Sequence, residues 1–392
     1  MALKVGRAAA APPFMVMDVI AAANAQAARA TPGDPRVIRM EVGQPGTGAP
    51  RGAAEAAAAA LRAGEPMGYT EAFGRRSLRE RIAAHYQSWY ALDLPADRVA
   101  VTVGASGGFP LAFLAAFDRG DRVALASPFY PPYLNILTAL GIEPVVIETD
   151  AATRFQPSVA LLDSLDPLPD GLIIASPCNP AGTMLHPDEL AAIAHWCEAR
   201  GVRLVSDEIY HGLQYETPLA TAAAFSPSAI VINSFSKYFS MTGWRIGWMV
   251  LPEDLLRPVE CLAQNLFISA PHVSQVAAEA AFGCGEELDA NVARYRRSRA
   301  HLLSALPAAG FDRLGPAEGA FYLYADVSER TNDSIAFCAR MLAETGVATT
   351  PGVDFDRARG GHFLRFSYCG PEPDMQESSG PPLTLALTAR RC

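Results

Sequence analysis

The chain has 392 residues, 50% of them hydrophobic, and carries a formal net charge of −9 at pH 7. A chain of this length can bury a large core and ordinarily divides into two domains. The excess of acidic residues argues against an electrostatic footprint for nucleic acid or for an anionic membrane. We therefore expect a soluble globular protein that has neither nucleic acid nor a membrane as a partner.

The cysteines indicate a reducing compartment. Seven of them are dispersed along the chain, too far apart for a zinc knuckle, and an odd number does not suit a disulfide framework. We expect no metal site and a cytoplasmic location.

The first 27 residues resemble a signal peptide in composition. Pro12, Pro13 and Asp18 interrupt the apolar stretch, however, which favours an amphipathic helix from about Phe14.

The middle of the chain alternates short apolar runs with helical patterns. The runs are VAVTV (99–103), RVALAS (122–127), PVVIET (144–149), GLIIAS (171–176), VRLVSD (202–207), AIVINS (229–234) and RIGWMV (245–250). Such alternation is typical of βαβ units, so we predict an α/β fold with a mostly parallel, doubly wound sheet covered by helices on both faces.

The pattern of the sequence changes beyond the helical segments that extend to about residue 306. A long helical pattern (288–306) precedes the strand-like GAFYLYADV, a helix near 334–345 and the strand-like HFLRFSYC. We predict a large domain over 41–284. A linker helix and a small α+β domain should follow over 285–392, and the N-terminal segment 1–40 should pack with the small domain.

Polar or aromatic residues follow five of the predicted strands, at the edge where parallel sheets bind ligands. Each has an ordinary explanation alone: a tight turn, a core aromatic, a turn asparagine, a helix N-cap or a solvated lysine. One small anionic ring compound would explain all of them together. In chain order they are Ala105, Ser106 and Gly107 in a Gly-rich turn; Tyr130; Asn179; Asp207 and Tyr210; and Ser234, Ser236, Lys237 and Arg245.

A phosphorylated pyridine aldehyde needs the groups that these positions offer. Lys237 can form a Schiff base with the aldehyde, Asp207 can keep the ring nitrogen protonated, and Tyr210 can donate to the phenolic oxygen. Tyr130 can stack on the ring. The phosphate would lie at the Ser106-Gly107 turn, where backbone N–H groups and a helix dipole favour an anion, together with Ser234, Ser236 and Arg245.

Several segments resemble the class I/II aminotransferases, which use pyridoxal 5′-phosphate and have the fold type I of the aspartate aminotransferase superfamily. They occur in the family's order from about residue 14 to residue 375. The most specific are SFSK with MTGWRIGW, SDEIY and NPAGT; GYTEAFGRRSLR, VGASGG and LRFSYC add to them. The resemblance implies an enzyme that moves an amino group between an L-amino acid and a 2-oxo acid.

The resemblance also implies roles for single residues. Lys237 would hold the cofactor and shuttle a proton, and Asn179 would lie beside the phenolic oxygen and the substrate carboxylate. Arg365 would bind that carboxylate with its planar fork. The backbone of Gly43 would lie against the substrate. Tyr69 would reach the phosphate in a neighbouring subunit, which implies a homodimer with shared sites.

Two other functions compete with transamination. A C–S lyase or another β-eliminating relative would keep every cofactor contact, so the motifs separate it poorly. A cofactor-binding transcription regulator would need a fused DNA-binding domain, and about 40 residues before VGQPG are too few. The sequence does not identify the amino acid, because it does not reveal which residues line the pocket.

The C-terminal end departs from the family. EPDMQES begins a helix as in relatives, but Gly380, Pro381 and Pro382 stop it, and LTLALTARRC lacks a charged face. Both a natural short tail and a frame change in the coding sequence would explain this. We expect a mobile tail beyond about Ser378 and a small domain that has lost part of its cover.

Overall fold

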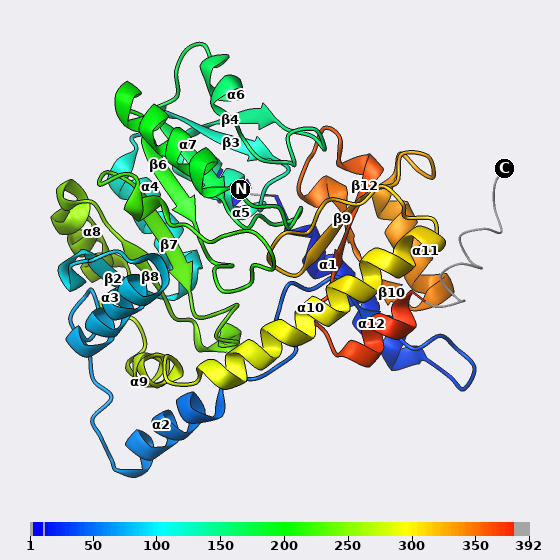
Figure 1. Ribbon diagram of the computed structural model, residues 1–392, viewed down its shortest axis with the longest axis horizontal. Coiled ribbons are helices and arrows are strands. Elements are labelled where there is room, and N and C mark those ends of the chain that lie inside the picture. The colour runs from blue at the N-terminus through cyan, green and yellow to red at the C-terminus, as the bar shows by residue number, and fades with distance from the viewer. Residues whose placement is uncertain (1–2, 11, 380–392) are drawn as a thin grey trace.

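The computed structural model describes residues 3–10 and 12–379, so the expectation for the tail concerns residues that lie almost wholly outside the described part. The chain forms two lobes, and the long helix α10 (Gly285–Ala308) runs from one to the other (Figure 1). No helix among the described residues is both long and apolar enough to cross a membrane.

The larger lobe is built on a seven-stranded sheet in the order β2-β8-β7-β6-β5-β3-β4. Only β8 is antiparallel to its neighbours β2 and β7; the other pairs are parallel. The mostly parallel α/β fold is confirmed. Its strands are β2 (Val99–Thr102), β3 (Arg122–Ser127), β4 (Glu143–Glu148), β5 (Gly171–Ala175), β6 (Arg203–Asp207), β7 (Ile230–Ser234) and β8 (Gly247–Val250).

The apolar runs form strands because helices cover both faces of the sheet. Leu172 and Ile174 of β5 pack in the core shared with α3 (Arg76–Tyr90) and α7 (Pro187–Arg200). Ile173 between them packs in the other core, which is shared with α4 (Gly104–Ala116), α5 (Pro132–Leu140) and α8 (Glu253–Leu266). Side chains alternate across a strand, so a continuous apolar run requires apolar cover on both sides.

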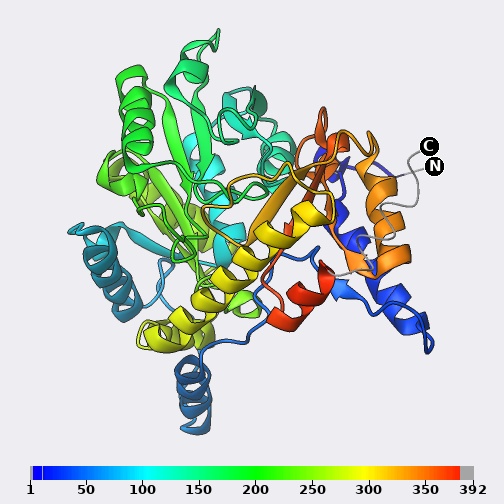
Figure 2. The same ribbon diagram turned by 45° about the vertical axis from the view of Figure 1, so that its right-hand side comes forward.

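Three further helices belong to the larger lobe: α2 (Arg51–Arg62), α6 (Val159–Asp163) and α9 (His272–Ala281). Helix α2 packs on α9 and otherwise stands away from the sheet (Figure 2). Its alanine-rich sequence is a strong helix former, and only one of its faces is buried.

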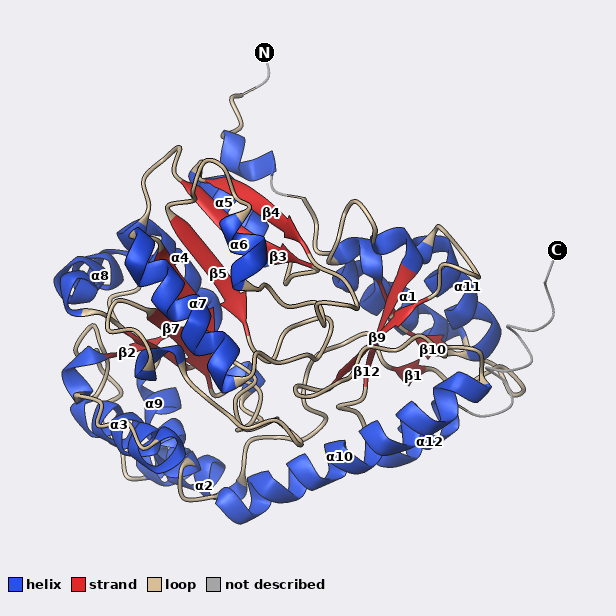
Figure 3. Cartoon of the chain, turned by 45° about the horizontal axis from the view of Figure 1, so that its top comes forward, coloured by secondary structure: helices blue, strands red, loops and turns tan. Residues whose placement is uncertain are grey.

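The smaller lobe holds an antiparallel sheet in the order β11-β12-β9 and the parallel pair β1-β10, separate from the large sheet (Figure 3). Pairing of β1 with β10 joins the N-terminal segment to this lobe, while the division at 1–40, 41–284 and 285–392 stays a prediction. Its elements are α1 (Met15–Arg29), β1 (Ile38–Arg39), β9 (Tyr322–Asp326), α11 (Ser334–Thr345), β10 (Val347–Ala348), β11 (Thr350–Pro351), β12 (Phe363–Ser367) and α12 (Glu372–Ser378).

Candidate active site

A cavity of about 370 Å³ lies at the carboxyl ends of the parallel strands and is lined by residues of both lobes. This is where open α/β sheets bind their ligands. Most of the residues predicted from the sequence line it: Gly43, Ala105, Ser106, Tyr130, Asn179, Asp207, Tyr210, Ser236, Lys237, Arg245 and Arg365. Gly107, Ser234 and Tyr69 are not among the lining residues.

Lys237 follows β7 in a turn that its neighbouring serines hold. Ser236 donates its N–H to Ser234 Oγ at 3.1 Å, and Ser234 Oγ lies 3.1 Å from the carbonyl oxygen of Ile246. Ser234 therefore supports the turn from behind the cavity. The Lys237 ammonium donates to the carbonyl of Gly43. Burial lowers the pKa of Lys237 from 10.5 to about 8, which favours the neutral, nucleophilic amine.

Asp207 ends β6 with a carboxylate that is only 4% exposed. The hydroxyl of Tyr133 and the N–H of Ile209 donate to it, the latter at 3.0 Å. Burial raises the pKa of Asp207 to about 6, against the effect of these two hydrogen bonds and of the charge on Lys237. Such a carboxylate is suited to pairing with a buried cation, because the attraction between the two charges would offset the free-energy cost of burying the carboxylate. Sequence reasoning missed Tyr133.

Glu208 lies next to Asp207 in the chain and is also buried. Its Oε1 accepts hydrogen bonds from the N–H of Ala222 at 2.8 Å and from Ser206 Oγ at 3.1 Å. Burial raises the pKa of Glu208 to about 8. Burial thus disfavours a charge on Glu208, and Asp207 is the carboxylate that lines the cavity.

The N-terminus of α4 and Arg245, which both line the cavity, are suited to binding an anion. The first backbone N–H groups of a helix have no partner within the helix, and Ser106 and Gly107 belong to that first turn. Arg245 Nη2 lies 3.4 Å from Ser106 Oγ. Gly104 has a φ of 67°, which favours glycine, and a Cβ atom there would lie 2.7 Å from Arg245 Nη2. This geometry suits a phosphate group.

Arg365 on β12 is 2% exposed and reaches the cavity from the smaller lobe. Its Nη1 donates to Asn179 Oδ1 at 2.7 Å, and its Nη2 donates to Thr350 Oγ1 at 3.0 Å and to the carbonyl of Glu41. Its buried Nε has no partner among the described residues. The guanidinium thus keeps unused donor capacity, as a carboxylate-binding arginine would.

Tyr322 on β9 is a cavity residue that sequence reasoning missed. Its hydroxyl lies 2.7 Å from that of Tyr210, and the Arg365 guanidinium lies over its ring at 4.5 Å from the centroid. A Cβ atom at Gly43 would lie 1.9 Å from the Tyr322 hydroxyl, so only glycine fits there. The residues around GAFYLY predicted a strand, but nothing in their pattern indicated that the ring of Tyr322 would reach the cavity.

The N-terminal segment forms an apolar wall that the sequence also did not reveal; its residues are Phe14, Val16, Met17 and Ile20. The ring of Phe14 meets that of Tyr130 edge to face, with centroids 5.9 Å apart. Asp354 of the smaller lobe accepts the N–H groups of Met15 at 3.0 Å and Val16 at 3.2 Å, which fixes the start of α1.

Tyr69 lies in the connection between α2 and α3 and is 82% exposed. Within a single chain it does not contribute to the cavity.

The cavity residues fit pyridoxal 5′-phosphate. They offer a lysine of lowered pKa, a buried carboxylate, a helix N-terminus with an arginine for an anion, and the ring of Tyr130. No group of three or more His, Cys, Asp or Glu side chains within 3–10 and 12–379 is arranged to hold a metal ion.

Comparisons with known proteins agree with this geometry. The family model for aminotransferase class I and II matches residues 35–378. A valine–pyruvate aminotransferase of Mycobacterium tuberculosis is 51% identical over 380 residues, which cover 96% of each chain. A (5-formylfuran-3-yl)methyl phosphate transaminase of Methanocaldococcus jannaschii is 32% identical, over 93% of this chain and 94% of the relative.

Solved structures show the same similarity. A crystal structure of an aminotransferase from Mycobacterium tuberculosis has a TM-score of 0.96 at 49% identity and covers 99% of this chain and 100% of that one. Aspartate aminotransferase from Thermus thermophilus with maleate has a TM-score of 0.90 at 29% identity and covers 98% and 100%. The chain therefore belongs to the class I and II aminotransferases, pyridoxal-phosphate-dependent enzymes that transfer an amino group between an amino acid and a 2-oxo acid.

Proposed function

We propose that this aminotransferase acts on amino acids with apolar side chains, valine among them, and uses pyruvate as the 2-oxo acid. The observation that carries the proposal is the apolar wall of Phe14, Val16, Met17 and Ile20 over the cavity. An apolar side chain gains free energy by leaving water against such a wall. A side-chain carboxylate would lose its hydration there and find no partner.

The charges of the cavity support the same substrate class. The cations among its described lining residues are Lys237, Arg245 and Arg365. The cofactor aldehyde, the phosphate and the substrate's α-carboxylate would each occupy one of them. Aspartate or glutamate would require a fourth cation for the second carboxylate. The 51% identical relative named for valine and pyruvate supports the proposal.

Each residue at the reacting centre of the cavity has a separate proposed role. When bound, pyridoxal phosphate supplies a ring that accepts electrons from the substrate's α-carbon. Lys237 holds the aldehyde carbon and moves the proton at the α-carbon, while Asp207 keeps the ring nitrogen protonated and Tyr210 donates to the phenolic oxygen. Arg365 and Asn179 hold the α-carboxylate.

The phosphate would be bound by Ala105, Ser106, Gly107, Ser236 and Arg245. Four of these line the cavity, and Gly107 contributes as part of the first turn of α4. Ser234 would act indirectly, through the turn that it holds for Ser236. Tyr130 would lie against the ring.

The proposal includes a homodimer in which Tyr69 completes the phosphate site of the other subunit. Tyr69 is exposed, and the neighbouring Thr70 N–H donates to Ser269 Oγ at 3.4 Å. The residues just before Ser269 are exposed and apolar: Leu266, Phe267 and Ile268. Exposed apolar residues gathered beside one tyrosine favour a contact with a second chain.

We also propose a cytoplasmic location, which the dispersed thiols favour.

A half-reaction assay tests the substrate class. Purified holoenzyme is mixed with L-valine, L-alanine, L-aspartate or L-phenylalanine, and the loss of the cofactor's absorption band is followed by stopped flow. We expect kcat/KM for valine to exceed that for aspartate by about 100-fold or more, since an unpaired buried carboxylate costs several kcal/mol. Equal values for the two would contradict the proposal. Release of a thiol, pyruvate and ammonia from a cysteine conjugate without a 2-oxo acid acceptor would instead support elimination, because the thiol is the leaving group on the β-carbon and the remaining enamine hydrolyses to pyruvate and ammonia.

A further inference from the structure

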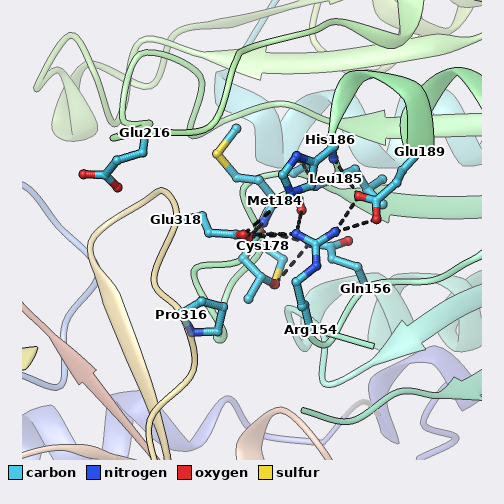
Figure 4. A network of polar contacts seen from close by, with 12 residues as sticks. Arg154, Gln156, Cys178, Met184, Leu185, His186, Glu189, Glu216, Pro316 and Glu318 are labelled. Atoms are coloured by element: carbon cyan, nitrogen blue, oxygen red, sulfur yellow. Dashed lines mark hydrogen bonds and ion pairs between the residues drawn. The ribbon is translucent and has the colours of Figure 1, made fainter. Parts of the chain in front are cut away.

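Arg154 lies at the centre of a polar network between the two lobes (Figure 4). Its Nη2 donates to both carboxylate oxygens of Glu189, at 2.5 and 2.6 Å. Its Nη1 donates to Glu318 at 3.0 Å and to the Met184 carbonyl at 3.2 Å. Glu318 closes the ring of contacts because it also accepts the Met184 N–H at 2.8 Å. We call these four residues the Arg154 network.

One side of the network holds the segment that carries Asn179. Met184 belongs to the connection between β5 and α7, which folds back on itself where Cys178 N–H donates to the Thr183 carbonyl at 3.0 Å. Gln156, two residues after Arg154, donates to the same Thr183 carbonyl at 3.0 Å. Residues 154–156 therefore fix the turn on which Asn179 stands.

The other side of the network holds the entry to β9. Glu318 precedes Tyr322 by four residues, and Gly319 donates its N–H to the carbonyl of Gly182 at 2.8 Å. A Cβ atom at Gly182 would lie 2.7 Å from the Tyr322 carbonyl oxygen. Strand β9 pairs with β12, where Tyr324 stands opposite Arg365. The network thus joins the Asn179 turn to the strand beside Arg365.

The backbone at Arg154, where these contacts are made, has a strained conformation. Arg154 and Phe155 both adopt left-handed conformations, with φ of 55° and 56°. Side chains other than glycine rarely occupy this region unless the surrounding structure holds them there. Phe155 packs edge to face on Tyr324 at 5.5 Å between centroids, so both strained residues contact the smaller lobe.

We infer that Arg154 and Glu318 are positioning residues that set the spacing between Asn179 on the larger lobe and Arg365 on the smaller lobe, and hence the affinity for the substrate's α-carboxylate. Neither residue lines the cavity. The inference rests on the carboxylate-binding roles proposed for Asn179 and Arg365.

The test measures binding of α-methylvaline, which has no α-hydrogen and so binds without turnover, through the absorption change of the holoenzyme. The variants are Arg154→Gly, Arg154→Met and Glu318→Gln. Glycine suits the positive φ at 154, so Arg154→Gly should fold at least as well as the parent. We expect each dissociation constant to rise about tenfold, with cofactor content unchanged and KM affected more than kcat. Arg154→Gly combined with Glu318→Gln should weaken binding no more than one change alone, since both break the same pair.

Two controls separate this role from general loss of structure. Arg297→Met breaks an exposed ion pair with Glu372 inside the smaller lobe, at 2.9 Å, and should leave α-methylvaline binding unchanged. Arg365→Lys should weaken that binding directly. If Arg365→Lys weakens binding while Arg154→Gly stays within about twofold of the parent, the positioning role is wrong and the proposed function stands. Unchanged affinity in both variants would overturn the carboxylate site together with the inference.

Discussion

Burial moves the pKa values of the two central charged residues toward each other. Lys237 falls to about 8 and Asp207 rises to about 6, because each loses hydration in its charged form. Both shifts belong to the cofactor-free chain. A bound ring with a protonated nitrogen would pair with Asp207, and the aldehyde would consume the amine of Lys237, so the cofactor relieves both penalties.

Capture of the cofactor should depend on pH through Lys237. The attacking amine must be neutral, and its neutral fraction rises as pH increases through a pKa of about 8. We expect the rate at which cofactor-free protein takes up pyridoxal phosphate, followed by absorbance, to rise with a midpoint near pH 8 and to level off above about pH 9. A midpoint near 10.5, the ordinary lysine value, would contradict the lowered pKa.

The site of attachment can be mapped because the chain contains only one other lysine, Lys4. Borohydride reduction followed by peptide mapping should place the cofactor on Lys237, and Lys237→Ala should abolish transamination. Cofactor on Lys4, or normal turnover by Lys237→Ala, would overturn the assignment.

Asp207→Ala should retain some cofactor but slow removal of the α-proton. Without a carboxylate the ring nitrogen loses its proton, and the barrier should rise by about 4 kcal/mol or more. Single-turnover kinetics with L-valine would measure this. A cofactor analogue with a permanently charged ring nitrogen should restore activity. A variant within tenfold of the parent would exclude this role for Asp207.

Tyr322 offers a test that separates its hydroxyl from its ring. Tyr322→Phe keeps the ring under the Arg365 guanidinium, so amino-acid affinity should remain within about twofold. Tyr322→Ala removes the ring and should weaken affinity about tenfold, or 1.4 kcal/mol. Titration with α-methylvaline would compare the two. Equal losses in both variants would assign the effect to the hydroxyl bonded to Tyr210 instead.

At the scale of elements, α1 matters because it presents the apolar wall and is anchored by Asp354. Asp354→Ala removes the carboxylate that accepts two N–H groups at the start of α1, which should cost about 1 kcal/mol. We expect faster hydrogen exchange over 15–20 and a higher KM for valine.

Asp333→Ala is the matched control, because Asp333 caps α11 through the N–H of Ala336 at 3.0 Å, on a helix that does not line the cavity. It should lower stability by a similar amount and leave the KM for valine unchanged. If both variants raise KM equally, the wall has no special part in substrate binding.

At the scale of the whole molecule, the homodimer can be tested by mixing inactive subunits. A mixture of Lys237→Ala chains with Tyr69→Ala chains should form hybrid dimers that contain one intact site, since each site would take Lys237 from one subunit and Tyr69 from the other. After unfolding and refolding together, about a quarter of the parental activity should return, because about half of the dimers are hybrids. No recovery above the Tyr69→Ala value would exclude the shared site.

The sequence by itself determined the seven strands of the large sheet and which polar residues follow them. Apolar runs such as GLIIA indicate strands because their side chains must be buried on both faces, and this requirement is local. Lys237, Asp207 and Asn179 could be assigned to one edge because parallel strands end together. Arg365 and Gly43 were added only through the family resemblance.

Tertiary structure alone decided which residues from distant parts of the chain complete the cavity. Tyr322 lies in an ordinary strand pattern, and α1 shows only a general amphipathic pattern, so neither carries a local signal of its contact with the site. Asp354 meets α1 across more than 300 residues of chain. Patterns of period 2 and 3.6 report burial of a face but not its partner, because the partner depends on how the lobes pack.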